Sequence, residues 1–287
     1  MRATSKEFNF PLESLQSFFR SHHVKHIKST AHKVRKNLQT KYVKEYMQGK
    51  SIKELAKEEN YSPALLARLI LEEVTDLDLG GKKKGLGNAL KNPLQELGGI
   101  NIIKEEYRKS EEQQQQIDRM VKSSSFPIKE IEIITTTRLA LEVKNAVDSD
   151  PLCGPASDRA KHFIGIEYEI ILERGLKNLG IPFESEAQLR KKGSARTPDV
   201  LLSSPIGVQV GSEWQVVCWI DSKALYGDID THQTHVLPQA ESYLHRFGPG
   251  MICYWFGHAP LSQLENVNGD LAIVGWKIPE IILWPDG

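Results

Sequence analysis

The sequence predicts an α/β protein in which an all-helical N-terminal part, containing a helix-turn-helix, precedes a mixed β-sheet flanked by helices. Apolar residues recur at spacings of three and four through residues 12–70, which is the period of a helix. Short apolar runs typical of strands begin at residue 200, and all five tryptophans lie between Trp214 and Trp284. This change of pattern predicts a boundary between a helical domain and an α/β domain.

Composition excludes several classes of protein. The 287-residue chain has a formal net charge of zero and is 40% hydrophobic, with no run near the roughly 20 apolar residues that span a bilayer. Its N-terminus lacks the apolar stretch of a signal peptide. Three cysteines are too few for an all-cysteine zinc site and are typical of a reducing compartment. We therefore expect an intracellular protein of the nucleus and cytoplasm, without membrane contact.

Capping signals define two short helices in residues 1–79, which we interpret as one helical domain. Ser51–Glu54 has the pattern of a capping box, and Ser62–Pro63 combines an N-cap serine with a proline in the first turn. The two helices have the lengths of a helix-turn-helix, which can place its second helix in the DNA major groove. Arg68 is the one base-reading type of side chain in that helix. Contact with the DNA backbone or with a protein is therefore favoured over sequence-specific recognition.

Basic residues are concentrated at the N-terminus. Residues 1–53 contain twelve Lys and Arg against three Glu and no Asp, a formal charge of +9. Such a segment predicts a surface for nucleic acid or an acidic partner. The alternative is a solvated helix face whose lysine stems pack on neighbouring residues.

Residues 80–127 separate the two predicted domains. The segment combines a Gly- and Lys-rich run with a Gln-rich run and shows little periodicity. We interpret it as a flexible linker with one helix around residues 101–120, or as an inserted helical hairpin. The predicted α/β domain then occupies residues 128–287.

Two carboxylates are expected to meet at one edge of the predicted sheet. Asp199 precedes a short apolar run, and Asp221 ends the apolar strand that follows a turn at residues 207–212. A hairpin through this turn places the two side by side. Because converging carboxylates repel each other, the arrangement suits a hard cation such as Mg²⁺. Lys223 shares a strand face with Asp221 and can orient an attacking water or stabilise charge on a phosphate.

These residues resemble the motif of the PD-(D/E)XK nucleases. Pro198–Asp199 and Asp221–Lys223 match its P-D and D-x-K elements, and a helix glutamate precedes the sheet. The resemblance implies a restriction-endonuclease-like fold that hydrolyses phosphodiester bonds in DNA with Mg²⁺ or Mn²⁺. It also implies that Glu169, Asp199 and Asp221 are metal ligands and, with Lys223, catalytic residues. Glu167 is the alternative acidic residue, but Glu169 shares its side of the helix with Leu172, Leu176 and Leu179.

Gln239 and Tyr243 form a Gln-x-x-x-Tyr pattern that resembles the RecB-like subgroup of these nucleases. Their spacing places both on one helix face, and the resemblance implies contact with the substrate. Each motif is weak alone, whereas their order along the chain indicates the nuclease fold. The simpler alternative is that the two aspartates cap strand ends and that Lys223 is their salt-bridge partner.

Longer stretches resemble the eukaryotic family of codanin-interacting nucleases. They include residues 61–72 and residues 243–256, which contain Arg-Phe-Gly-Pro-Gly. This resemblance implies codanin as a partner in addition to DNA. Since membership of such a family does not establish activity, the alternative function is an adaptor that binds codanin or DNA with little or no catalysis.

Overall fold

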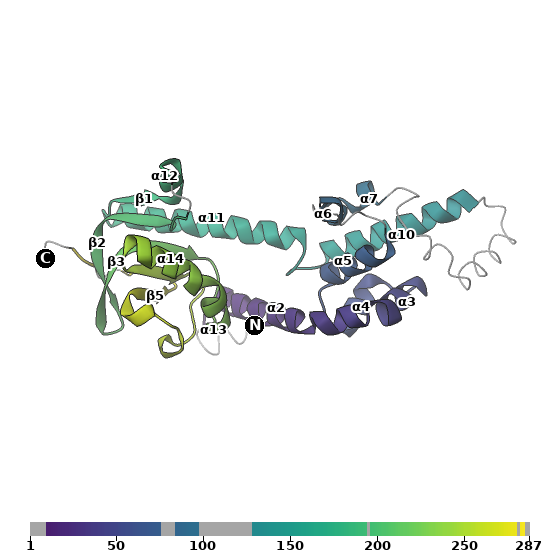
Figure 1. Ribbon diagram of the computed structural model, residues 1–287, viewed down its shortest axis with the longest axis horizontal. Coiled ribbons are helices and arrows are strands. Elements are labelled where there is room, and N and C mark those ends of the chain that lie inside the picture. Colours follow the sequence, from purple (N-terminus) through teal and green to yellow (C-terminus); the bar gives the residue numbers. More distant parts are fainter. Residues whose placement is uncertain (1–9, 76–83, 98–127, 194–195, 280–281, 285–287) are drawn as a thin grey trace. The chain divides into compact units, whose positions relative to one another are not determined.

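The computed structural model of the chain describes residues 10–75, 84–97, 128–193, 196–279 and 282–284 and confirms a mixed α/β protein. The chain divides into two compact units (Figure 1). A helical unit comprises Val24–Ala160, and a sheet unit comprises Met1–His23 together with Lys161–Gly287. No helix in the described ranges is long and apolar enough to cross a membrane.

Two helices of the helical unit begin at the capping residues that the sequence predicted. Ser51 and Glu54 form a capping box at the start of α4, and the Ser62 hydroxyl accepts the Leu65 N–H ahead of Pro63 in α5. The helices from the N-terminus onward are α2 Leu12–Lys36, η1 Leu38–Val43, α3 Lys44–Met47, α4 Ile52–Glu58, α5 Pro63–Val74, α6 Lys84–Lys91, α7 Pro93–Glu96 and α10 Ile128–Asp148.

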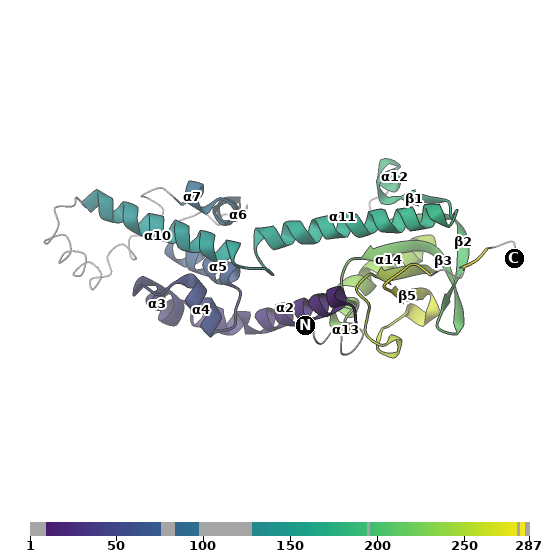
Figure 2. The same ribbon diagram turned by 180° about the vertical axis from the view of Figure 1, so that it is seen from behind.

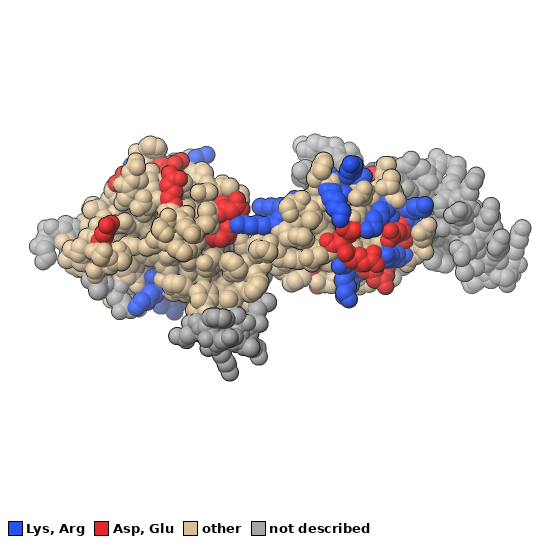
Figure 3. Space-filling view, turned by 90° about the horizontal axis from the view of Figure 1, so that it is seen from below, with Lys and Arg blue, Asp and Glu red and all other residues tan. Residues whose placement is uncertain are grey.

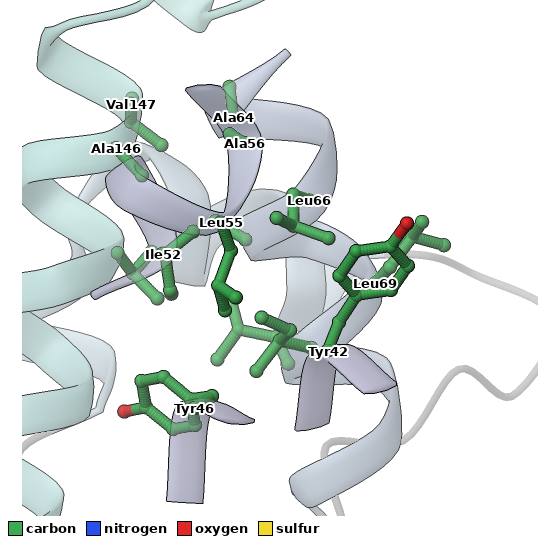
Figure 4. Close-up of a cluster of buried hydrophobic side chains, with 14 of the residues drawn as sticks. Tyr42, Tyr46, Ile52, Leu55, Ala56, Ala64, Leu66, Leu69, Ala146 and Val147 are labelled. Carbon is green, nitrogen blue, oxygen red and sulfur yellow. The ribbon is translucent and has the colours of Figure 1, made fainter. Parts of the chain in front are cut away.

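Helix α5 lies in the core of the helical unit. Seven of its twelve residues are buried and none is exposed. Figure 4 shows Leu66 of α5 near Leu55 of α4 and Tyr42, in the same apolar cluster. Arg68 forms an ion pair with Glu72 at 2.9 Å. The other five residues, Arg68 among them, are partly exposed, so α5 presents only a narrow face to solvent, and its contact with DNA or with a protein stays a prediction.

The domain boundaries of the structure differ from those predicted. Helix α10 begins at the residue expected to open the α/β domain, yet its Leu139 is buried in the core of the helical unit. Residues 84–97, expected in the linker, form α6 and α7, and Leu86 and Leu97 are buried in that same core. Both differences arise from long-range apolar packing, which local composition does not reveal. The remainder of the predicted linker, with the helix expected around residues 101–120, lies outside the described residues.

Acidic residues offset part of the basic charge of the N-terminal segment. Glu59 forms ion pairs with both Lys41 and Lys33, and these lysines lower the pKa of Glu59 to about 2. Lys50 lies between two further glutamates. Figure 3 shows Lys and Arg interspersed with Asp and Glu on this side of the helical unit. The excess of basic residues therefore does not form an uninterrupted basic surface on this face.

The sheet unit is built on a mixed sheet that contains six strands within the described residues. The strand order is β1-β2-β3-β4-β5, with β6 paired to β2; β3–β4 and β4–β5 are parallel and the other pairs antiparallel. The strands are β1 Phe183–Ser185, β2 Val200–Val210, β3 Glu213–Lys223, β4 Gly250–Tyr254, β5 Leu271–Gly275 and β6 Ile282–Leu283. The helices are α11 Pro155–Asn178, α12 Glu186–Lys191, α13 Ile229–Thr231, η2 His232–Val236, α14 Leu237–Phe247, η3 Leu261–Gln263 and η4 Val267–Gly269.

Side chains of the sheet alternate between two apolar clusters. On β4, Met251 and Cys253 pack in the cluster that includes α11, whereas the alternate residues pack in the cluster that includes α14 (Figure 2). Because neighbouring side chains of a strand point to opposite faces, these two helices cover opposite faces of the sheet. Gly250 allows this packing, since a Cβ there would lie 2.0 Å from the ring of Trp219.

Candidate active site

Asp199 and Asp221 lie opposite each other on the antiparallel pair β2–β3. Val200 pairs with Ile220, and continuing this register by one residue places Asp199 opposite Asp221. The backbone N–H of Ser222 donates a hydrogen bond of 2.6 Å to Asp199 Oδ2, which holds the Asp199 carboxylate against β3. The structure thus brings together two carboxylates from the start of one strand and the end of the next.

Asp221 carries a buried carboxylate whose charge is opposed by a neighbouring lysine. The residue is 2% exposed. Its Oδ2 forms an ion pair with Nζ of Lys223, two residues further along the strand. A buried carboxylate opposed by one ammonium group is only partly compensated. The site can therefore accept additional positive charge.

Gln239 and Tyr243 of α14 hold Lys223 rather than project away from the site. Lys223 Nζ donates to Gln239 Oε1 at 3.0 Å, and Gln239 Nε2 donates to Tyr243 Oη at 2.7 Å. The Tyr243 hydroxyl donates in turn to the carbonyl of Thr197 at 2.8 Å. Tyr243 is 3% exposed, so its side chain is committed to this chain of hydrogen bonds. These bonds give both residues a supporting position; Gln239 is exposed, and the substrate contact suggested by the sequence stays a prediction.

Glu169, rather than Glu167, lines a pocket together with Asp199. Glu167 is exposed, whereas Glu169 is half-buried and borders a pocket of about 120 Å³. The lining residues are Glu169, Glu173, Ser185, Glu186, Ala187, Asp199 and Val200. Leu172 and Leu176 on Glu169's side of α11 are buried as expected, but Leu179 is 39% exposed because the helix ends at Asn178.

Two acidic residues of this pocket were not indicated by the motifs. Glu173 follows Glu169 by one helical turn, and this spacing of four is a signal that could have identified it. Glu186 is the first residue of α12, and its N–H donates to the carbonyl of Asp199 at 2.8 Å. Its carboxylate accepts a hydrogen bond of 2.6 Å from Arg190. Only the pairing of β1 with β2 brings Glu186 here, and no motif spacing predicts that contact.

Burial and neighbouring negative charges raise the pKa of two candidate ligands. Burial is the largest cause that raises the pKa of Asp199 well above its usual range, and the charge of Asp221 adds to it. The Ser222 N–H opposes this shift by stabilising the ionised form. Burial, followed by the charges of Glu186 and Asp221, also raises the pKa of Glu169. A cation among these oxygens would relieve the repulsion.

The donor chemistry of the site suits a hard divalent cation, but the ligands are not yet gathered around one point. Carboxylate oxygens are the ligands that Mg²⁺ and Mn²⁺ prefer, and Oδ2 of Asp221, which pairs with Nζ of Lys223 in this structure, is such an oxygen. Over the ranges that the structure describes, no three His, Cys, Asp or Glu side chains stand close enough to hold a metal ion as they are. Binding of one cation by all three carboxylates therefore requires side-chain movement, in particular at the Lys223–Asp221 ion pair.

Comparison with known proteins identifies the family of this chain. Residues 135–274, which contain all the candidate site residues, match a family model described as a protein of unknown function with the TPD sequence motif. The human protein named CDAN1-interacting nuclease 1 is 31% identical over 262 residues, which cover 86% of this chain and 78% of that relative. The chain belongs to the CDAN1-interacting nuclease 1 family.

Other similar proteins differ in how much of their length is matched. The Xenopus laevis protein of the same name is 34% identical over 207 residues, covering 71% of this chain and 54% of the relative. The chain thus spans about half the length of this curated relative. An uncharacterised protein, L539, of Acanthamoeba polyphaga mimivirus is 32% identical over 117 residues, 39% of this chain and 40% of its own. No solved structure matches the chain.

Proposed function

We propose that the chain is a divalent-cation-dependent nuclease of the PD-(D/E)XK type that hydrolyses phosphodiester bonds in DNA. The observation that carries the proposal is the apposition of Asp199 and Asp221 across β2–β3, with Lys223 two residues beyond Asp221. The relatives' printed names, which contain the word nuclease, support the proposal.

Each residue has a distinct role in the proposed reaction. Glu169, Asp199 and Asp221 would hold Mg²⁺ or Mn²⁺, which would make water a better nucleophile and neutralise phosphate charge. Lys223 would direct its ammonium group to the attacking water or to the charge that develops on the phosphate. Gln239 fixes the direction of that ammonium group, and Tyr243 fixes Gln239.

A cleavage screen with the purified full chain tests the proposal. Branched, duplex and single-stranded DNA, and RNA for comparison, are incubated with Mg²⁺, with Mn²⁺ or with EDTA. We expect cleavage of at least one DNA substrate with either cation, none in EDTA, and a loss of at least about a hundredfold in Asp221→Asn. Cleavage that persists in EDTA or in Asp221→Asn contradicts the proposed site.

Gln239→Ala is expected to lower kcat about tenfold and to leave KM nearly unchanged. The substitution removes the acceptor of a hydrogen bond from a charged group, and such bonds have about the free energy that corresponds to a tenfold rate change. Steady-state kinetics on the best substrate measures the effect. Gln263→Ala, at an exposed glutamine of η3, is the matched control. A variant that raises KM with kcat intact would instead assign Gln239 to substrate binding.

A second candidate function is that of an adaptor for a codanin-like protein. The relatives' names describe them as CDAN1-interacting, and the mixed charges and buried α5 of the helical unit suit a protein partner better than a DNA groove. We propose codanin as the partner that this unit contacts. The cleavage screen separates the two functions, because an adaptor binds codanin in a purified mixture yet cleaves none of the nucleic acids.

A further inference from the structure

Three serines on one side of the first half of α2 join this helix to the sheet unit. Ser14 accepts a hydrogen bond of 3.1 Å from Trp276 Nε1, and Ser17 accepts one of 2.9 Å from the backbone N–H of Tyr226. Ser21 donates a hydrogen bond of 2.6 Å to Asp228 Oδ2. Their spacings of three and four place them on one helix face, and we call these residues the serine seam. All its contacts lie within the sheet unit.

Aromatic contacts reinforce the serine seam at both ends. Phe18 packs edge-on against Tyr226 with ring centroids 5.4 Å apart, and Phe10 packs edge-on against Trp276 at 6.2 Å. Edge-to-face pairs at these distances are favourable beyond their area burial. Two independent kinds of contact therefore fix the first half of α2 against the segment around Tyr226 and against Trp276.

The segment that the seam holds directly follows the candidate catalytic lysine. Lys223 is the last residue of β3, and its carbonyl accepts hydrogen bonds from the N–H groups of Leu225 and Trp255. Residues 224–228 lead from there to α13, whose N-cap is Asp228. Ser17 and Ser21 bond to Tyr226 and Asp228 in this short connection. Without them, the end of β3 would be followed by a loop with fewer external contacts.

We propose that Ser17 and Ser21 are positioning residues for Lys223, a role that rests on the proposed nuclease function. The ammonium group of Lys223 must leave Asp221 and face the reacting phosphate, and errors of about 1 Å at such a group cost orders of magnitude in rate. Pairing with Tyr254 of β4 holds the backbone of Lys223, and backbone bonds of Gly227 to Gly257 and Ala259 anchor the connection that follows. The seam adds support at Tyr226 and Asp228, on either side of Gly227, as Gln239 does at the ammonium group.

Helix α2 also makes this support accessible to regulation. It is one continuous helix of 25 residues, and residues from Val24 onward belong to the helical unit. A partner that shifts or bends the helix changes the seam without touching the catalytic residues. Negative charge introduced at Ser21 would also weaken the seam, because it would repel the buried carboxylate of Asp228, to which the Ser21 hydroxyl donates.

The test compares Ser17→Ala/Ser21→Ala with Ser29→Ala in the full chain. Ser29 lies on the same helix, and its hydroxyl donates to the carbonyl of His26. In the double variant we expect the Tyr226 amide to exchange hydrogen at least about tenfold faster. We also expect kcat to fall about tenfold with KM unchanged. The threonine pair Ser17→Thr/Ser21→Thr keeps both hydroxyls and should restore kcat, which also guards against a general folding defect.

Each result bears on the inference in a defined way. Faster exchange with unchanged kcat, or equal effects in the alanine and threonine pairs, overturns the positioning role. Unchanged exchange shows that the seam does not hold the loop. If wild-type protein cleaves nothing, the proposed function itself fails and takes the positioning role with it. Cleavage by wild type that is insensitive to the double variant overturns the positioning role alone.

Discussion

Lys223→Met is expected to lower the rate of DNA cleavage by about a thousandfold. Methionine keeps the length of the side chain but removes the ammonium group, and removing a group that stabilises charge in the transition state costs about a hundred- to a thousandfold. The substitution also leaves the buried Asp221 without its ion-pair partner, which destabilises the folded protein in the absence of metal. The melting temperature in EDTA should therefore fall below that of wild type.

Added Mg²⁺ should reverse this loss of stability in Lys223→Met. The cation takes the place of the ammonium beside Asp221, so the rise in melting temperature with Mg²⁺ is expected to exceed that of wild type. Lys192→Met is the matched control, because Lys192 is exposed and pairs with Glu184 at the surface. Thermal melts with and without Mg²⁺, together with cleavage rates, make the measurement. Full cleavage by Lys223→Met would leave the lysine as a salt-bridge partner without a catalytic role.

Local signals predicted those parts of the structure that sequence neighbours determine. The caps at Ser51 and Ser62 depend on residues three positions away. The meeting of Asp199 with Asp221 depends only in part on the tight hairpin, whose turn includes Gly211 with a φ of 64° that favours glycine. The register near the turn pairs Ile206 with Val217 and, continued along both strands, would set Asp199 opposite Ala224; a register shift between Leu201 and Ile206 brings it opposite Asp221 instead. Order along the chain therefore indicated that the two carboxylates lie at one end of the hairpin, but not the register that makes them meet.

Contacts between distant segments of the chain determine the features that local sequence patterns did not predict. Packing against α4 and α10 buries seven of the twelve residues of α5, and the caps at its N-terminus alone do not predict this burial. Tyr243 reaches a carbonyl 46 positions away, and this contact, which the spacing within α14 does not indicate, places Tyr243 in the chain of hydrogen bonds that supports Lys223. The serine seam joins residues about 200 or more positions apart, and no pattern within α2 indicates its partners.

Asp199→Asn is expected to raise the melting temperature at neutral pH while abolishing cleavage. Because the folded protein raises the pKa of Asp199 above its value in the unfolded chain, the folded state binds more protons than the unfolded state in the window between them. Stability contributed by this group is thus present below the unfolded pKa, about 3.9, and is lost as pH rises toward the folded pKa. Asparagine removes the charge that causes the loss and can still accept the Ser222 N–H.

The expected gain is largest near pH 7 and vanishes near pH 4, where Asp199 is largely protonated in the folded protein. A change of about 1 kcal/mol corresponds to roughly 2–4 °C in a chain of this size. Thermal melts across this pH range measure it, with Asp270→Asn, at an exposed aspartate, as the control.

Mg²⁺ should stabilise wild type, by about 2.7 kcal/mol at a hundred times its dissociation constant, but not Asp199→Asn. Equal stabilisation of both proteins by Mg²⁺ would exclude Asp199 as a ligand. A gain in melting temperature without loss of cleavage would show that the aspartate is a strained structural residue. In a site built from carboxylates that repel each other, the repulsion weakens the folded state and a bound cation relieves it. We therefore expect Asp199→Asn to gain stability and to lose both cation binding and cleavage.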